Sequence, residues 1–187
     1  MPDDTTHQDR LIQDRLKRGG APPGLSGILQ SKDADTDEGE ASSLAFGYLR
    51  GLRDQSAALE LRFRNGGSMW FPYSIMGPWK YDPSEGLLLT FNSAVVYVVL
   101  IRGSNLAKPL NEGAINLTHA GLQRHRVLFI REMSDDEISR VGENGPTIDS
   151  IEVAEFESHQ AIREWLSKKA PGFLRGTVGM EDGHGRG

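Results

Sequence analysis

Residues 58–106 read ALELRFRNGGSMWFPYSIMGPWKYDPSEGLLLTFNSAVVYVVLIRGSNL and form the densest apolar and aromatic stretch of the chain. Apolar and charged residues alternate from Ala58 to Arg64, a period of two that predicts a half-buried β-strand. Asn65-Gly66-Gly67 then predicts a tight turn, because Asn and Gly accept positive φ angles. Ser68 to Tyr73 should return as a second strand, so the stretch begins with a β-hairpin.

Pro72 indicates that this return strand is an outer one. Proline has no N–H to donate, so a strand that contains it lies at the edge of a sheet or breaks there. A second hairpin is predicted from Leu87–Phe91 and Val95–Ile101. The latter segment is apolar at nearly every position, which favours a central strand covered on both faces.

Further elements are predicted on both sides of this stretch. They are a helix over Leu44–Arg53 capped by Ser42 or Ser43, a strand over Arg126–Met133, a helical turn from Ser134 with Glu137 completing a capping box, a strand over Ile148–Phe156, and a helix capped by Ser158 that runs to Lys169. Together they predict an α+β fold: a twisted antiparallel sheet or partial small barrel with short flanking helices and disordered termini.

The apolar residues are distributed unevenly along the chain. Residues 1–43 and 176–187 carry few large apolar side chains, a composition typical of disorder. We therefore expect one domain over residues 44–175 between two disordered tails. Within the first tail, residues 8–18 are either disordered or a short partner-binding helix.

The composition excludes several classes of protein. The chain contains no cysteine, which excludes disulfides, thiolate catalysis and cysteine-ligated metal sites. The N-terminus is acidic where a signal peptide needs a basic start, and no apolar run approaches the roughly 20 residues of a membrane span. We expect a cytoplasmic protein that does not contact a membrane.

The net charge of −5 is divided between two segments of opposite sign. Residues 41–131 carry ten Lys or Arg and five Asp or Glu (+5), whereas residues 132–164 carry two Arg and ten Asp or Glu (−8). The first segment contains a local basic cluster: His119, Arg124, His125, Arg126 and Arg131. Two interpretations are open. The cluster binds a phosphate backbone or an acidic partner, or it faces the acidic segment of the same chain.

No motif for catalysis, for a metal or for a cofactor is present, so none of the three is expected. HExxH, GxSxG and GxxxxGK[ST] patterns are all lacking. Glu155, Glu157 and His159 would share one side of an extended strand and offer a carboxylate–histidine metal site. In the competing interpretation Ser158 begins a helix, which breaks that alternation.

Two features suggest nucleic-acid binding. One is a group of aromatic residues that either stack on bases or sugars, or pack in the core and at an edge: Trp70, Phe71, Tyr73, Trp79 and Tyr81. The other is Ile101-Arg102-Gly103-Ser104-Asn105-Leu106, which follows the second hairpin.

A short helix, an alternating strand that ends at the Asn65-Gly66 turn, further strands and then Ile101–Leu106 follow one another along residues 44–106. This order of elements resembles the Sm-like family, whose second motif reads much like Ile-Arg-Gly-x-Asn. The resemblance implies a five-stranded barrel that assembles into rings and binds single-stranded RNA. It also implies that Arg102 and Gly103 shape a nucleotide pocket and that Asn105 supports the turn.

The sequence favours a small non-enzymatic binding or interaction protein. A charge-segregated surface and an outer strand suit strand addition or self-association, so a protein or a second copy is the expected partner. The alternatives are an Sm-like RNA-binding oligomer and a carboxylate/histidine metal-dependent hydrolase; no DNA binding is predicted. The candidate ligand-binding residues are Arg102, Gly103, Asn105, Arg124 and Arg126.

Overall fold

A computed structural model describes residues 40–110 and 115–175 of the chain. The strands in this part are β1 (Glu40–Ser42), β2 (Phe46–Leu49), β3 (Ala58–Arg62), β4 (Ser68–Pro72), β5 (Lys80–Asp82), β6 (Gly86–Asn92), β7 (Val96–Arg102), β8 (Val127–Arg131) and β9 (Ser150–Phe156). The α-helices are α2 (Asp135–Val141) and α3 (His159–Lys169). Short helical turns are η1 (Tyr73–Ile75), η2 (Leu117–Gly121), η3 (Leu122–Arg124), η4 (Gly142–Asn144) and η5 (Pro171–Leu174).

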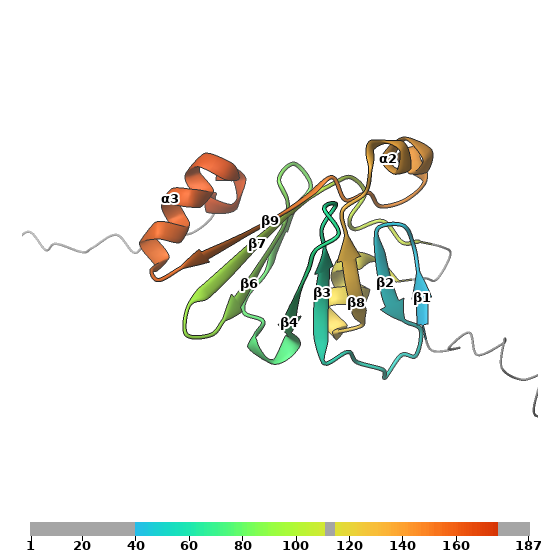
Figure 1. Cartoon of the computed structure of the whole chain (residues 1–187), viewed down its shortest axis with the longest axis horizontal. Helices are drawn as coiled ribbons and strands as arrows, with labels where there is room; N and C mark the ends of the chain where they lie inside the picture. Colours follow the sequence, from blue (N-terminus) through green and yellow to red (C-terminus); the bar gives the residue numbers. More distant parts are fainter. Residues whose placement is uncertain (1–39, 111–114, 176–187) are drawn as a thin grey trace, which may run out of the picture. The chain divides into compact units, whose positions relative to one another are not determined.

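The strands form two separate sheets (Figure 1). Sheet A has five strands in the order β1-β2-β8-β3-β4, and sheet B has four in the order β5-β6-β7-β9. Every neighbouring pair is antiparallel except β3 and β8, which run parallel. The predicted α+β class is confirmed, with two twisted sheets that do not close into a barrel.

The β3–β4 hairpin forms as the alternation of residues 58–64 predicts. Leu59 and Leu61 are fully buried, and Gly66 takes a positive φ of 86° in the turn. The N–H of Phe63 donates to the carbonyl of Gly67 across this turn at 2.9 Å. The side-chain pattern and the turn residues therefore specify the same register.

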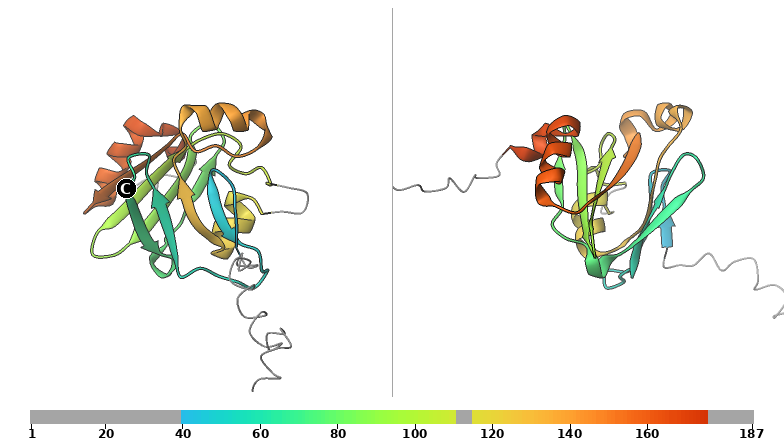
Figure 2. Two further views of the ribbon diagram at one scale, coloured as in Figure 1. Left: turned by 45° about the vertical axis from the view of Figure 1, so that its right-hand side comes forward. Right: turned by 60° about the vertical axis from the view of Figure 1, so that its left-hand side comes forward.

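The two sheets lie as layers, and α3 lies outside sheet B (Figure 2). Apolar side chains form a larger core between the sheets and a smaller core between sheet B and α3. Phe71 of β4 stacks on Phe91 of β6 across the main core, with ring centroids 4.3 Å apart. On the other face of sheet B, Ile162 and Leu166 of α3 pack in a smaller cluster with Leu88, Val98 and Leu100. This covering of both faces confirms the prediction that the β7 segment is a central strand.

Two of the three predicted helix caps, those at Ser134 and Ser158, are confirmed. The hydroxyl of Ser134 accepts from the N–H of Glu137 at 3.3 Å, and the carboxylate of Glu137 accepts from the N–H of Ser134 at 2.9 Å, which completes the capping box of α2. The hydroxyl of Ser158 accepts from the N–H of Ala161 at 3.2 Å and caps α3.

The helix predicted over Leu44–Arg53 is wrong, because this segment contains strand β2. Phe46 is fully buried in the core, and Gly47 lies beneath the ring of Phe129 on β8, where a Cβ atom would collide with that ring. The apolar residues that suggested a helical stripe do not all point inward, since Leu52 is 78% exposed. Pairing with β8, a contact distant in sequence, overrides the local spacing.

The first described strand begins at Glu40, several residues before the domain boundary expected at residue 44. The helix considered for residues 8–18 and the tail over residues 176–187 lie outside the described residues.

Candidate functional site

Strand β4 is the outermost strand of sheet A, and among the described strands it pairs with β3 alone. Its sequence is SMWFP, and of these residues only Phe71 is buried. Trp70 is 62% exposed and Met69 is 38% exposed. The prediction that Pro72 marks an outer strand is confirmed, and the strand carries two large apolar side chains into solvent.

The register of the hairpin shows which main-chain groups of β4 face outward. Tyr73 donates to the carbonyl of Ala57, and Phe63 donates to that of Gly67. Hydrogen-bonded and non-hydrogen-bonded pairs alternate along an antiparallel ladder. Met69 and Phe71 lie two residues from Gly67 and Tyr73, so their main-chain groups also point at β3. The remaining residues of β4, Ser68, Trp70 and Pro72, point theirs toward the free edge.

The chemistry of this edge permits strand addition. Ser68 and Trp70 each offer an N–H and a carbonyl, and Pro72 offers a carbonyl alone. Natural edge strands are commonly protected by charged side chains, bulges or prolines. Strand β4 has no charged residue, and its only such device is Pro72 at one end.

The five aromatic residues considered as a stacking platform do not share one surface. Phe71 and Tyr73 are buried, Trp79 and Tyr81 are half-buried against the core, and Trp70 is exposed. The structure therefore supports core and edge packing for this group.

Arg102 lies where β7 approaches the end of α3. Its Nη2 donates to the carbonyl of Lys169 at 2.5 Å, and its Nε lies 4.0 Å from Oε1 of Glu152. Glu152 also accepts from Nζ of Lys169 at 2.6 Å. Arg102 thus connects the last turn of α3 to sheet B.

Gly103 and Asn105 fix the loop that follows β7. A Cβ atom on Gly103 would collide with the carbonyl of Thr147, so only glycine permits this close approach. Asn105 has a positive φ of 56°, and its Nδ2 donates to the carbonyl of Gly145 at 3.2 Å. The nucleotide-binding role that the Sm-like resemblance implies for Arg102, Gly103 and Asn105 stays a prediction.

Arg124 and Arg126 belong to a different part of the surface, next to the end of β2. They line a pocket of about 360 Å³, here named the arginine pocket, together with Tyr48, Arg50, Leu52, Ile115 and Ala120. Within residues 40–110 and 115–175, no hydrogen bond or ion pair connects Arg124 or Arg126 to the group around Arg102. The five candidate residues therefore form two groups.

The basic cluster predicted from the sequence also divides. Arg131 pairs with Glu137 of the acidic segment at 2.9 Å. The hydrogen bond from Arg131, helped by the N–H of Ser134, lowers the pKa of Glu137 to about 2. In the described part of the chain Arg124 and Arg126 form no ion pair, so the intramolecular interpretation applies to Arg131 alone.

Glu155, Glu157 and His159 do not lie on one strand. Strand β9 ends at Phe156, and Ser158 caps α3 at the position where the alternation would continue. No group of three His, Cys, Asp or Glu residues suited to a metal ion is found in the part of the chain that the structure describes.

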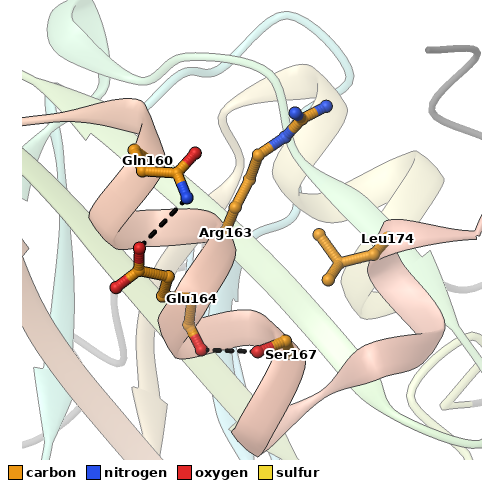
Figure 3. A pocket seen from close by; sticks show the side chains of 5 residues that line it. All are labelled: Gln160, Arg163, Glu164, Ser167 and Leu174. Atoms are coloured by element: carbon orange, nitrogen blue, oxygen red, sulfur yellow. Dashed lines mark hydrogen bonds between the residues drawn. The ribbon is translucent and has the colours of Figure 1, made fainter.

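A shallow hollow of about 400 Å³ lies on the outer surface of α3 (Figure 3). The side chains of Gln160 and Glu164 bind each other at 3.0 Å, and the hydroxyl of Ser167 donates to the carbonyl of Glu164 at 2.7 Å. None of its lining residues is buried, so the hollow offers no enclosed polar group to a ligand.

A cleft of about 420 Å³ lies beside the β3–β4 turn and the start of α2, and contains both signs of charge. Each arginine that lines it is paired with a carboxylate: Arg62 with Glu60 at 2.7 Å, Arg64 with Asp135 at 3.3 Å, and Arg131 with Glu137 at 2.9 Å. This pairing leaves no arginine of the cleft without a counterion.

Sequence reasoning missed five of the seven residues that line the arginine pocket: Tyr48, Arg50, Leu52, Ile115 and Ala120. Tyr48 and Arg50 lie far from Arg124 along the chain, and only the pairing of β2 with β8 brings the segments together. No local pattern in the sequence carries that information.

Comparison of the chain with protein-family models, curated proteins and solved structures found no match. Among the described residues, none of the helices has both the length and the apolar character needed to cross a membrane. The geometry of the β4 edge and of the arginine pocket is therefore the basis for interpreting function.

Proposed function

We propose that the chain is a cytoplasmic, non-enzymatic interaction protein that pairs through the free edge of β4 with β4 of a second copy. The observation that carries this proposal is an outer strand whose outward main-chain groups have no partner among the described residues, together with a Trp70 side chain that is 62% exposed. Such an edge is a template for the addition of another strand.

The edge is self-complementary about a two-fold axis at Trp70. In an antiparallel pair, Trp70 would exchange two main-chain hydrogen bonds with Trp70 of the second copy. The N–H of Ser68 would donate to the carbonyl of Pro72 of the second copy, and the same contact would repeat across the axis. Only the carbonyl of Ser68 would lack a donor, because Pro72 has no N–H.

The side chains of β4 also suit this pairing. Opposite residues of a hydrogen-bonded pair have Cα atoms about 5.5 Å apart, so the two Trp70 indoles would contact each other on the outer face of the sheet. No charged residue on β4 would face its own copy. Both Trp70 side chains would lose contact with water, which favours association.

Light scattering during size-exclusion chromatography, over a range of protein concentrations, tests the proposal. We expect twice the chain mass for the wild type and a monomer for Trp70→Lys, because two lysines would then meet across the axis. Leu52→Lys is the matched control: it also replaces an exposed apolar residue with lysine, but outside β4, and should stay dimeric.

Several outcomes contradict the proposal. A wild-type chain that stays monomeric at all concentrations rules it out, as does a Trp70→Lys variant that dimerises like the wild type. A ring-sized assembly that carries nucleic acid would replace it with the Sm-like alternative.

Pro72→Ala tests the main-chain register directly. The change restores an outward N–H opposite the carbonyl of Ser68 of the second copy, and Pro72 has extended angles (φ −59°, ψ 133°) that alanine accepts. Two added hydrogen bonds of about 1 kcal/mol each predict a dimer roughly thirtyfold tighter. A dimer formed only by apolar contact would not respond in this way.

A further inference from the structure

We infer that the arginine pocket binds a small phosphomonoester. The pocket lies beside β2 and η3, and β8 and β3 separate β2 from β4 in sheet A. The inference is therefore independent of the pairing proposed for β4.

Arg126 is buried, with 6% of its surface exposed, and its guanidinium is fixed by main-chain carbonyls. Nε and Nη2 donate to the carbonyl of Leu49 at 3.0 and 2.7 Å, and Nη2 also donates to the carbonyl of Arg50 at 2.7 Å. These bonds hold the group rigidly at the base of the pocket, so binding costs little side-chain entropy.

The charge of Arg126 has no counterion among the described residues, and one of its nitrogens is open to the pocket. None of the ion pairs in this part of the chain includes Arg126. Nη1 of Arg126 has no hydrogen-bond partner among the described residues. A fully enclosed Nη1 would then be a buried polar atom without a partner, but in this part of the chain Oγ1 of Thr118 is the only such side-chain atom. Nη1 is therefore accessible, and because a buried unpaired charge is costly, the site favours an anion.

Two further arginines, Arg50 and Arg124, line the same pocket and add positive charge to it. Arg50 and Arg124 are exposed and form no ion pair in the described part of the chain. Asp54, the acidic residue nearest to Arg50 in sequence, places its carboxylate against Gly51 and pairs with neither arginine. Three guanidinium groups without a carboxylate among the lining residues give the arginine pocket a strong positive potential.

The backbone that carries Arg124 and Arg126 has an uncommon conformation. The π-helical turn η2 and the 3₁₀ turn η3 lead into His125, a non-glycine residue with a positive φ of 54°. The ring of His125 stacks on Tyr73 with centroids 4.5 Å apart, and the hydroxyl of Tyr73 donates to the carbonyl of Val127 at 2.9 Å. Strained backbone of this kind persists where surrounding structure fixes it, often at ligand sites.

The size and lining of the pocket indicate the chemical class of the ligand. A phosphate dianion presents three oxygens, which matches three guanidinium groups better than the two oxygens and single charge of a carboxylate. A volume of about 360 Å³ exceeds that of a phosphate ion alone. The remaining space lies against Tyr48, Leu52 and Ile115, so the organic group of the ester is apolar or aromatic.

Titration calorimetry on the full chain at low salt tests the inference with phenyl phosphate, inorganic phosphate and benzoate as probes. We expect phenyl phosphate to bind more tightly than either of the other two. Arg50→Gln and Arg124→Gln should each weaken its binding about tenfold, the usual effect of losing a charge-assisted hydrogen bond. Both side chains are exposed and form no ion pair with another described residue, so neither change should disturb folding.

Arg53→Gln is the control, because it removes one exposed positive charge from the same segment without belonging to the pocket lining. It should leave the affinity for phenyl phosphate within about twofold, as expected for a screened surface charge. Trp70→Lys should also leave this affinity unchanged, which separates the pocket from the dimer edge.

Three results would overturn the inference. The first is no detectable binding of phenyl phosphate to the wild type at millimolar concentration. The second is an equal loss of affinity in Arg53→Gln and Arg124→Gln, which indicates general charge attraction. The third is benzoate binding as tight as phenyl phosphate, which would make the pocket a carboxylate site.

Discussion

Glu137 has a pKa of about 2, below its ordinary value of 4.5, because the guanidinium of Arg131 and the N–H of Ser134 bind its carboxylate. A lowered pKa means that the ionised pair stabilises the folded state at every pH above about 4.5. This stabilisation should disappear as the pH falls from about 4.5 to about 2.

Carboxyl NMR titration of Glu137 measures this pKa directly. Arg131→Gln should move it toward 4.5 and should flatten the acid side of the unfolding curve. A wild-type Glu137 that titrates at its ordinary value would contradict the pairing seen here.

Gly47 permits the ring of Phe129 to lie against the backbone of β2. Phe129 is itself covered by the guanidinium of Arg62, 3.7 Å from the ring centroid, so the ring has little freedom to move aside. Gly47→Ala should therefore destabilise the protein by about 1–3 kcal/mol, as overpacking commonly does. Urea unfolding measures the change.

Gly145→Ala is the comparison for Gly47→Ala. A Cβ atom on Gly145 would meet only Val141, at the ordinary contact distance of 3.4 Å, and its backbone is extended. The expected change is within about 0.5 kcal/mol. Equal effects of the two substitutions would contradict the contact between Gly47 and Phe129.

At the level of single elements, the cap of α3 offers a direct test. Ser158→Ala removes the side-chain acceptor for the N–H of Ala161 and should cost about 1 kcal/mol of folding free energy. Ser167→Ala, on the exposed side of the same helix, should cost less, because alanine is the better helix former and the lost contact is local. Thermal unfolding of the two variants should differ accordingly.

The strands were the elements most readily predicted from the sequence. Alternation in β3, the Asn65-Gly66 turn and the apolar run of β7 are local signals of burial, and each was confirmed. The error at β2 has a physical cause: in a strand of four residues, helical and extended spacing look alike. The pairing of β2 with β8 favours the extended conformation, and no local pattern in the sequence indicates this pairing.

The candidate site was predictable only in part. Arg124 and Arg126 stood out because basic residues cluster around them, and Pro72 identified β4 as an outer strand. Arg126 can be buried because its guanidinium donates to the carbonyls of Leu49 and Arg50, which belong to a segment distant in sequence. The exposure of Trp70 likewise depends on which face of sheet A meets the core.

In the whole domain, sheet B separates a larger core from a smaller one. Strand β7 borders both cores and has a strand on each side, whereas α3 contacts only the smaller cluster. Regions with fewer buried contacts open at a lower free energy than the global transition. We therefore expect α3 amides to exchange hydrogen through local opening, and β7 amides only through global unfolding.

Native-state hydrogen exchange with and without Leu166→Ala measures this difference. Removing the Leu166 side chain from the smaller cluster should cost about 2–5 kcal/mol locally and speed exchange in α3 first. Equal protection of α3 and β7 in the wild type would show that the two cores unfold together.

The insertion of β8 between β2 and β3 has a consequence for the order in which the protein is made. A ribosome synthesises β1 to β4 well before Val127, so β2 and β3 are made before the strand that lies between them in sheet A. Sheet A closes only when β8 emerges and pairs with both, a non-local and therefore slow step. Until then β2 and β3 present open edges to other nascent chains, and a translation product that stops before Val127 keeps both edges open.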